Sequence, residues 1–429
     1  MRNGMSRDAD STIEGDEGSL FADKDARAIV RRVQIRNFKS IGSCSVELRN
    51  LTILLGKNGA GKSNFLDALR FVTDGLQFSL EQAVLSRGGI DAVRTRSTGH
   101  PRNFAVRLEL TLPGFQSGTY EFEIAARGQD RFFVKHENLE ITSASGESIA
   151  HYALVEGKTK NGSPAQHPAA SADRLYLVAA SSLPEFRPTY DALVSMGFYN
   201  LNPEAMKKGQ TPDAGELLHR DGGNIASVIA RLAVDKPDVF VRIREYLERI
   251  VPGVKNFERI ALGPLETLEF RQEVQGSRHF WKFYPESISD GTLRVLGALT
   301  AVAQLANRRM PLTLVGIEEP ETALHPAAAG ALMDALREAT NHTQVIVTTH
   351  SPDLLNEVNI DAETLFVVKA EEGTTRIARP DNASLQAIRE HLYTPGELLR
   401  MDQLEPDLHD VQRQQQLSMS FDNGRDETV

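Results

Sequence analysis

The sequence predicts an α/β fold with a mixed sheet, interrupted by a large insertion that is first β and then helical. Three observations lead to this prediction. The glycine-rich segment 56–63, GKNGAGKS, stands between an apolar run and a helical pattern. After residue 285, apolar runs again alternate with helical patterns, as in a βαβ series. Between these parts, residues 104–142 alternate apolar and polar residues, which is typical of an antiparallel meander.

The composition is that of an ordinary globular protein and argues against several classes. Charged residues make up 25% and hydrophobic residues 41% of the 429 residues. The net charge of -10 gives no support to binding of DNA by bulk charge. Cys44 is the only cysteine, which excludes an internal disulfide and fits a reducing compartment. No run approaches the roughly 20 apolar residues of a membrane span, and the N-terminus lacks a signal-peptide pattern. We therefore expect a cytoplasmic protein without membrane contact.

The chain divides into five segments by composition. Each is distinguished by charge, hydrophobic period or turn residues. We expect a flexible acidic tail at 1–27, the first part of the α/β unit at 28–112, an insertion at 113–284, the second part of the α/β unit at 285–400, and a polar tail at 401–429 that is flexible from about Asp410.

The elements of the first part follow from short apolar alternations. Val33, Ile35 and Phe38, then Val46 and Leu48, then the run 51–55 indicate three short strands. The helix after the glycine-rich loop carries apolar residues on one face. The stretch 152–172 is rich in Gly, Ser and Pro, which fits a long hairpin tip or a mobile loop.

The later elements are mostly helical and then alternate. Asp235 and Pro237 mark a helix start, and Pro252 ends that helix. An apolar helix is expected from Thr292 to about Ala306. An uncharged run at 312–317, a small-residue helix at 327–336 and an apolar run at 345–347 complete a strand–helix–strand series, whose strands we expect to be central and parallel.

The glycine-rich loop has the complete pattern of a phosphate-binding P-loop. Its glycines let several backbone N–H groups point at phosphate oxygens, and the following helix adds the positive end of its dipole. Lys62 would neutralise the β- and γ-phosphates, and the Ser63 hydroxyl would bind Mg²⁺. The sequence thus predicts an ATP and Mg²⁺ site. We expect these residues to bind the nucleotide: Gly56, Lys57, Asn58, Gly59, Ala60, Gly61, Lys62, Ser63 and Asn64.

Hydrolysis needs carboxylates, and the run 312–317 delivers two at its end. Glu318 fits the role of a Mg²⁺ ligand, and Glu319 that of polarising the attacking water. His350 ends the next apolar run, 31 residues after Glu319. An imidazole there could hydrogen-bond the γ-phosphate. We predict Glu319, His350 and Lys62 as the catalytic residues.

The segment SISDGTLR suggests a second anion site. Ser289 and Gly291 open the apolar helix, where backbone N–H groups are free to bind phosphate. A plain N-cap is the alternative for the same residues. Beside the other three motifs, we favour the phosphate site.

Together these segments resemble the ABC-type ATPase head of the SMC/RecF class, and more closely its branch of OLD-like AAA ATPases of bacterial defence operons. The segments that carry the resemblance are VQIRNFKSIGSCSVEL, LLGKNGAGKSNFLDALRF, ESISDGTLRVLGAL, LVGIEEPETALHP and QVIVTTHSPDLL. They cover roughly 29–112 and 285–370.

The resemblance implies a homodimer with two ATP molecules held between head-to-tail heads. Ser289 would then face the P-loop of the other chain, and residues 321–325 would cross the interface. Asp290 replaces a glycine of the usual signature, Glu318 replaces an Asp found in many relatives, and His325 stands where an interface Asp is common. These departures fit the OLD-like branch and leave the rate of hydrolysis open, with slow turnover as one outcome. The glutamine of the usual Q-loop has no assignable position.

The leading function is an ATP-gated dimer that controls a separate effector, such as a nuclease, in anti-phage defence. Only 79 residues follow His350, too few for the nuclease domain of full OLD proteins. The alternative is a RecF-like DNA-repair ATPase that binds DNA directly. Two side-chain groups bear on these functions. Arg87, Arg94, Arg96, His100 and Arg102 would contact phosphates or form a solvated loop, and Glu405, Asp407, His409 and Asp410 fit a solvated acidic segment better than a metal site.

Overall fold

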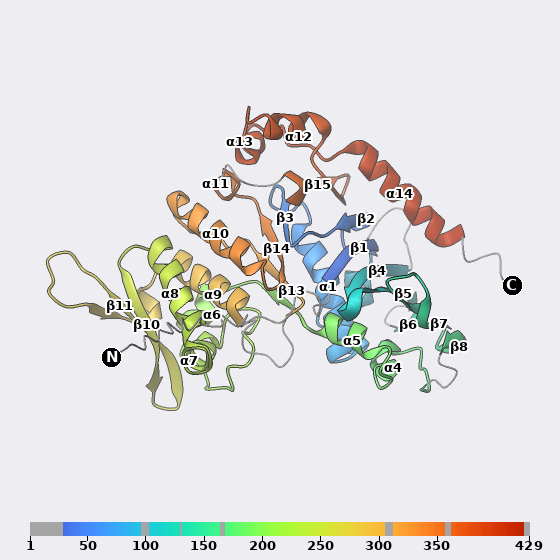
Figure 1. Cartoon of the computed structure of the whole chain (residues 1–429), viewed down its shortest axis with the longest axis horizontal. Helices are drawn as coiled ribbons and strands as arrows, with labels where there is room; N and C mark the ends of the chain where they lie inside the picture. The colour runs from blue at the N-terminus through green and yellow to red at the C-terminus, as the bar shows by residue number, and fades with distance from the viewer. Residues whose placement is uncertain are drawn as a thin grey trace, which may run out of the picture.

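One large mixed sheet runs across the molecule and organises the fold (Figure 1). The computed structural model describes residues 29–95, 103–128, 131–163, 168–304, 312–356 and 362–423. Within these ranges the sheet has 13 strands in the order β8-β7-β6-β5-β4-β1-β2-β16-β15-β3-β14-β13-β9. Its first seven strands are antiparallel, and β15, β3, β14, β13 and β9 are parallel. The predicted α/β class, with a mixed sheet and an antiparallel β lobe, is confirmed.

The antiparallel part contains the strands expected from the alternating patterns. Strand β5 pairs with β4 from residue 103 to residue 112, so the sheet continues without a break across the expected boundary at 112/113. Part of the 152–172 stretch forms the hairpin β7–β8, as one of the two expectations had it. The strands are β1 (Ile29–Phe38), β2 (Ile41–Glu47), β4 (Asn103–Leu112), β5 (Gln116–Arg127), β6 (Arg131–Thr142), β7 (Ser148–Val155) and β8 (Lys158–Ser163).

The parallel part carries the P-loop and the two later motifs on neighbouring strands. Every residue of β3 and β14 is buried, which explains their uncharged sequences. Because β3, β14 and β13 are parallel neighbours, the residues that follow them meet at one edge of the sheet. The strands are β3 (Leu51–Leu55), β9 (Met196–Tyr199), β13 (Leu314–Glu318), β14 (Gln344–Thr349) and β15 (Leu365–Glu371); β16 (Thr374–Ala378) pairs antiparallel with β15 and joins β2.

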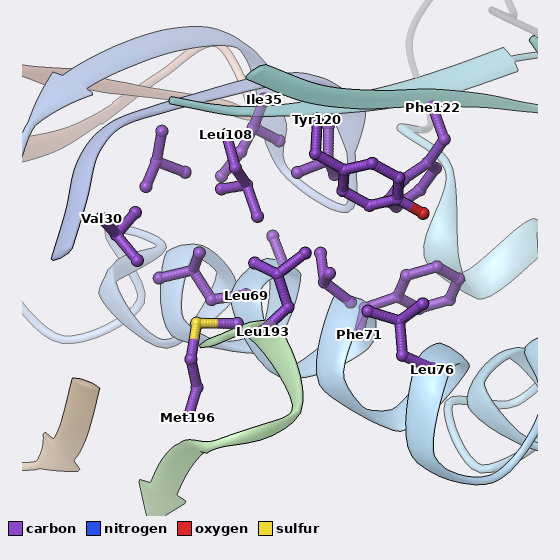
Figure 2. Packing of buried hydrophobic residues seen from close by; sticks show 14 of the residues in the cluster. Val30, Ile35, Leu69, Phe71, Leu76, Leu108, Tyr120, Phe122, Leu193 and Met196 are labelled. Atoms are coloured by element: carbon purple, nitrogen blue, oxygen red, sulfur yellow. The ribbon is translucent and has the colours of Figure 1, made fainter. Parts of the chain in front are cut away.

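Helix α1 (Lys62–Gln77) fills the space beneath the antiparallel strands and fixes the P-loop to them. Figure 2 shows Leu69 and Phe71 of α1 facing the apolar side of the sheet. The Phe71 ring makes edge-on contacts with Phe38 of β1 and Phe104 of β4, with centroids 5.9 and 5.2 Å apart. Short helices close this core: α2 (Leu80–Leu85), α3 (Ile90–Val93), α4 (Leu177–Ala180) and α5 (Arg187–Val194). The 3₁₀ turn η2 (Pro113–Phe115), which has no buried residue, joins β4 to β5.

A second core lies on the other side of the parallel strands and is mainly helical. The helix predicted after Pro237 is α8 (Pro237–Ile250). The predicted apolar helix is α9 (Asp290–Ala303), which begins two residues before the expected Thr292 because Ser289 caps it. A small sheet of β10 (Val254–Leu262), β11 (Leu265–Gln272) and β12 (Trp281–Phe283) flanks these helices. The other elements are α6 (Pro203–Lys207), α7 (Ile225–Asp235), η3 (Pro285–Ser287), η5 (Pro326–Ala328), α10 (Ala329–Ala339), α11 (Pro352–Leu355) and η6 (Ala362–Thr364).

The C-terminal region departs from the expected flexible tail. After α12 (Asn382–Arg389) and α13 (Pro395–Arg400), helix α14 (Leu408–Asn423) lies along β2 and β16. Val411 and Gln414 are buried in that contact, and the Ser43 hydroxyl donates to the Gln414 carbonyl at 3.3 Å. The buried face of α14 is narrow, so its apolar residues do not form a helical period that can be recognised in this polar sequence. The acidic tail expected at 1–27 lies outside the described residues.

In the part of the chain that the structure describes, no helix is both long enough and apolar enough to cross a membrane.

Candidate functional site

The P-loop curls around the Lys62 side chain between β3 and α1. The Lys62 ammonium donates to the carbonyl oxygens of Gly56 at 2.8 Å and Lys57 at 3.1 Å. Gly59 and Gly61 have φ angles of +77° and +101°, which L side chains rarely adopt. Lys62 is buried, and burial lowers the pKa of its ammonium while nearby Glu319 acts in the opposite direction. The loop thus presents a fixed cation inside a ring of backbone groups.

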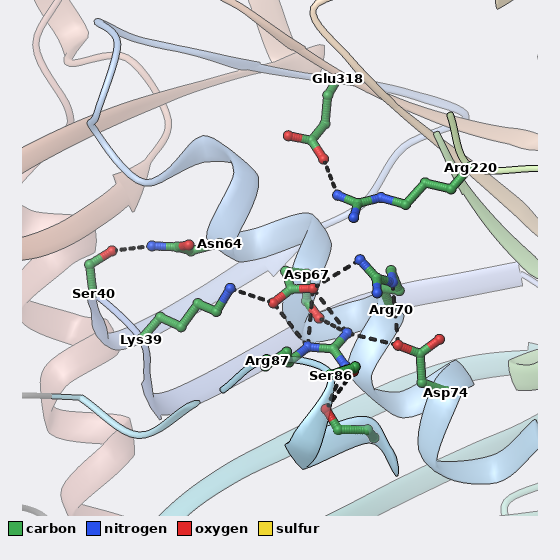
Figure 3. Close-up of polar contacts among 11 residues, drawn as sticks. Lys39, Ser40, Asn64, Asp67, Arg70, Asp74, Ser86, Arg87, Arg220 and Glu318 are labelled. Carbon is green, nitrogen blue, oxygen red and sulfur yellow. Dashed lines mark hydrogen bonds and ion pairs between the residues drawn. The ribbon is translucent and has the colours of Figure 1, made fainter. Parts of the chain in front are cut away.

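Strand β16 and the turn after β1 brace this loop. A Cβ atom on Gly61 would lie 2.0 Å from the Thr375 hydroxyl, so only glycine fits. The same hydroxyl donates to the Ala60 carbonyl at 2.9 Å and lies 2.6 Å from the Ser40 hydroxyl. Asn64, predicted to bind nucleotide, donates to Ser40 at 2.6 Å (Figure 3). Ser40 and Thr375 were not predicted as site residues, because they stand outside the P-loop pattern.

The rest of the loop shows two kinds of environment. Gly56 is buried, and a Cβ atom there would meet the Val368 carbonyl of β15 at 2.1 Å. Lys57 is exposed and pairs with Asp402 at 2.8 Å. Asn58 and Gly59 are exposed, as is Ser63 at the second position of α1. Exposed polar groups around a buried lysine are what an incoming phosphate chain requires.

The three predicted catalytic residues lie together at the sheet edge. The Glu319 carboxylate is 3.6 Å from the Lys62 ammonium and 3.1 Å from Nδ1 of His350. Its backbone N–H donates to the Thr348 carbonyl at 3.0 Å, which ties the turn after β13 to β14. Glu319 has a φ of +44°, an unusual value for a glutamate, and strained backbone positions of this kind cluster at functional sites.

Glu318, the predicted Mg²⁺ ligand, is held by a residue that the sequence did not point to. Its Oε1 atom lies 3.0 Å from the guanidinium of Arg220, which comes from the segment between α6 and α7 (Figure 3). The Glu318 side chain is 13% exposed and that of Arg220 44% exposed. A mostly buried carboxylate that faces a cation is also suited to a hard metal ion.

Glu321 lies inside the chain. It was expected to begin a segment that crosses a dimer interface, yet it is 7% exposed and shares a hydrogen bond with the Thr349 hydroxyl. Burial raises the pKa of this carboxyl above its ordinary value. Its Oε2 atom is buried without a hydrogen-bond partner. Later in the same segment, His325 caps η5 by accepting the N–H of Ala327 at 3.2 Å.

Ser289 and Gly291 lie at the start of α9, as expected. The Ser289 hydroxyl accepts the N–H of Thr292 at 3.2 Å, so the serine is an N-cap. A Cβ atom on Gly291 would lie 2.2 Å from the Ala323 carbonyl, so the glycine allows α9 to touch the loop after Glu319. Among the described contacts, no hydrogen bond or ion pair joins Ser289 or Gly291 to the P-loop of the same chain.

Several residues from two groups in the sequence analysis make structural contacts. Arg87 is not a solvated or phosphate-binding residue, because its side chain is 3% exposed and pairs with Asp67 and Asp74 at 2.9 Å each. Arg96, His100 and Arg102 lie outside the described residues. Glu405 pairs with Lys369, and Asp407 caps α14. Within the described ranges, no group of three or more His, Cys, Asp or Glu residues could hold a metal ion.

The sequence is similar to a known family of domains and to a phage protein. A family model described as "AAA domain, putative AbiEii toxin, Type IV TA system" matches residues 51–356. The Old nuclease of Escherichia phage P2 is 24% identical over 373 residues, which cover 80% of this chain and 59% of the phage protein. The chain therefore spans less than two thirds of that relative.

Solved structures similar to this one include heads of Smc proteins. One, bound to the C-terminal winged-helix domain of ScpA, has a TM-score of 0.46 and 17% identity, covering 82% of this chain and 97% of that one. Another, with an extended coiled coil bound to the C-terminal domain of ScpA from Pyrococcus furiosus, has a TM-score of 0.47 and 15% identity, covering 85% and 99%. The family match covers well over half of the chain and includes the P-loop, Glu318, Glu319 and His350. The chain therefore belongs to this family of AAA domains.

Proposed function

We propose that the protein binds ATP with Mg²⁺ and hydrolyses it to ADP and phosphate. The observation that carries the proposal is the convergence of Lys62, Glu319 and His350, with contacts of 3.6 and 3.1 Å about one carboxylate. The residues present also fit the two ligands. The P-loop backbone, which admits only glycine at Gly56 and Gly61, fits the phosphates of ATP. The Glu318 carboxylate, which faces the guanidinium of Arg220, fits Mg²⁺.

Each residue has a role that its position supports. Lys62 and the backbone of residues 56–64 bind the β- and γ-phosphates, and Ser63 and Glu318 hold Mg²⁺, which neutralises phosphate charge. Glu319 takes up the proton of the attacking water, and His350 holds the Glu319 carboxylate and contacts the γ-phosphate. The site works as one unit because β3, β13 and β14 are hydrogen-bonded neighbours.

The simplest test is phosphate release by the purified protein. Wild type should release phosphate from ATP only with Mg²⁺, and Lys62→Ala should lose nucleotide binding. Glu405→Gln, which alters a half-exposed surface pair, is the matched control and should keep the wild-type rate. Wild-type binding without any hydrolysis would reduce the function to nucleotide sensing.

We further propose a head-to-tail homodimer in which Ser289 and Gly291 complete the ATP site of the other copy. The N-terminus of α9 offers backbone N–H groups to an anion, and within its own chain it makes no described polar contact with the P-loop. Light scattering with and without a non-hydrolysable ATP analogue tests this. A mass that stays monomeric at saturating analogue would overturn it.

The dimer, in this proposal, controls a separate effector in anti-phage defence. The phage P2 relative is named a nuclease, whereas within the described residues of this chain no group of three or more His, Cys, Asp or Glu residues could hold a metal ion. Purified protein should leave plasmid DNA intact with ATP and either Mg²⁺ or Mn²⁺. Cleavage by the protein alone, lost in a Glu318→Gln variant, would place the nuclease in this chain and contradict a separate effector.

A further inference from the structure

The contact between Arg220 and Glu318 is placed where the proposed metal ion must bind. The guanidinium lies 3.0 Å from Oε1 of Glu318, the residue that ends β13 next to the P-loop (Figure 3). The two residues are 98 positions apart, and Arg220 belongs to no motif. Mg²⁺ binds its oxygen ligands at about 2.1 Å. The guanidinium and a Mg²⁺ ion bound to the same carboxylate oxygen would therefore repel each other.

Within the described residues, Glu318 is the anionic side chain that pairs with Arg220. Arg70 of α1 lies nearby, and its own charge is matched by Asp74 at 3.3 Å and Asp67 at 3.6 Å. After burial, the charge of Arg220 is the next largest cause that lowers the pKa of Arg70. Arg220 therefore faces a cation on one side and Glu318 on the other.

The side chain of Arg220 can move without its backbone. The Arg220 carbonyl accepts the N–H of Asn200 at 2.9 Å, and the next carbonyl, of Asp221, accepts the N–H of Asn202 at 2.9 Å. These bonds fix the segment to the end of β9, the neighbour of β13. The guanidinium, on a half-exposed side chain, remains free to turn toward solvent or toward an incoming anion.

We propose that Arg220 competes with the divalent cation for Glu318 and thereby sets how strongly Mg²⁺ promotes nucleotide binding. The inference rests on the proposed ATP and Mg²⁺ site. Arg220 orients the Glu318 carboxylate, and the metal that arrives with the triphosphate must displace the guanidinium. Removing the guanidinium should therefore make the metal bind more easily.

The test measures the affinity for a fluorescent, non-hydrolysable ATP analogue in EDTA and at saturating MgCl₂. The dissociation constant in EDTA divided by the dissociation constant in MgCl₂ reports how much the metal strengthens nucleotide binding. In Arg220→Ala this ratio should rise about two- to sixfold, the range expected for an ion pair of this exposure. Arg249→Ala is the matched control, because it breaks an exposed arginine–carboxylate pair, with Asp334 at 3.1 Å, away from the P-loop. Its ratio should equal that of the wild type.

A double-mutant cycle with Glu318→Gln assigns the effect to this contact. In the Glu318→Gln background, Arg220→Ala should leave the ratio unchanged, because the shared carboxylate is gone. Thermal melting of each variant checks that the fold is kept. An unchanged or lower ratio in Arg220→Ala, with normal analogue binding, overturns this inference alone. A wild type that binds no analogue overturns the proposed function and this inference with it.

Discussion

The Lys207 ammonium lies 2.6 Å from the Asp290 carboxylate, at the N-terminus of α9. Asp290 stands where the usual signature has a glycine, and a carboxylate there would repel a phosphate that approaches Ser289. Lys207, the last residue of α6, cancels that charge. The departure from the signature is therefore compensated by a residue 83 positions earlier in the chain.

This pairing makes a prediction about dimer assembly. Lys207→Ala should weaken ATP-dependent dimerisation several-fold, because the Asp290 carboxylate would then meet the partner's γ-phosphate unneutralised. Adding Asp290→Gly should restore assembly. Light scattering over a concentration series measures both, and high salt should reduce the difference. Equal dimerisation of wild type and Lys207→Ala would contradict this role.

Glu319→Gln should lower kcat for ATP hydrolysis by about 10² to 10⁴, the usual contribution of a general base. ATP should still bind, because the contacts of Lys62 with the loop carbonyls do not depend on Glu319. The variant should therefore collect as an ATP-bound dimer, visible by light scattering. Phosphate release at the wild-type rate by Glu319→Gln would contradict the assignment of Glu319 as the general base.

Ser289 needs a pair of substitutions, because its hydroxyl also caps α9. Ser289→Ala removes both the cap and the proposed phosphate contact, and loss of the cap alone costs about 1 kcal/mol. Ser289→Gly removes the hydroxyl at a cost of only a few tenths of a kcal/mol in capping. Both variants should lose ATP-dependent dimerisation and keep monomer nucleotide binding. If Ser289→Gly dimerised normally, the serine would be an N-cap and no more.

Gly61→Ala should abolish nucleotide binding and destabilise the fold. The new Cβ atom would lie 2.0 Å from Oγ1 of Thr375, and the residue would keep a φ of +101°. Gly373→Ala is the matched control, because Gly373 has a φ of +78° and nothing within 4 Å of its Cβ position. The control should lose only about 1 kcal/mol of stability in urea unfolding and bind nucleotide normally. Equal losses in both variants would show that backbone strain, rather than contact with Thr375, decides this position.

Glu137 of β6 predicts a pH dependence of stability. It is buried and accepts hydrogen bonds from the hydroxyls of Tyr120 and Tyr152 at 3.1 and 3.0 Å and from the N–H groups of Tyr176 and Leu177. Burial raises the pKa of Glu137 to about 7, although these hydrogen bonds act in the opposite direction. Between its unfolded pKa near 4.5 and about 7, the folded state holds the proton more tightly than the unfolded state.

The free energy of unfolding should therefore fall as pH rises through that window, by on the order of 3 kcal/mol from this group. Urea unfolding at pH 5 and pH 8 measures it. Glu137→Gln cannot ionise and should show a smaller difference between the two pH values, even if it is less stable at both. An undiminished difference in Glu137→Gln would assign the pH dependence to other groups.

Local patterns were sufficient to predict much of the fold and of the candidate site. The P-loop is contiguous, and its flanking strand and helix have clear periods, so Lys62 and its neighbours could be placed from sequence. Glu319 and His350 each end an apolar strand, which predicted that they share an edge of the sheet. Arg220 and Thr375 could not be found in this way, because each reaches the site from a segment without a motif. Ser40 lies in one of the segments that carry the family resemblance, but its side chain reaches the P-loop only through the fold.

The sequence by itself determined the chemistry available to this protein: a phosphate cradle, two carboxylates, a histidine and a capped helix that can receive an anion. Only the tertiary structure decided which charges face one another. Strand order brought Glu319 to Lys62 and His350, and the segment after β9 set Arg220 against Glu318 and Lys207 against Asp290. The physical reason is that a motif is read from neighbours in the chain, whereas an ion pair depends on distances in space that long-range packing sets.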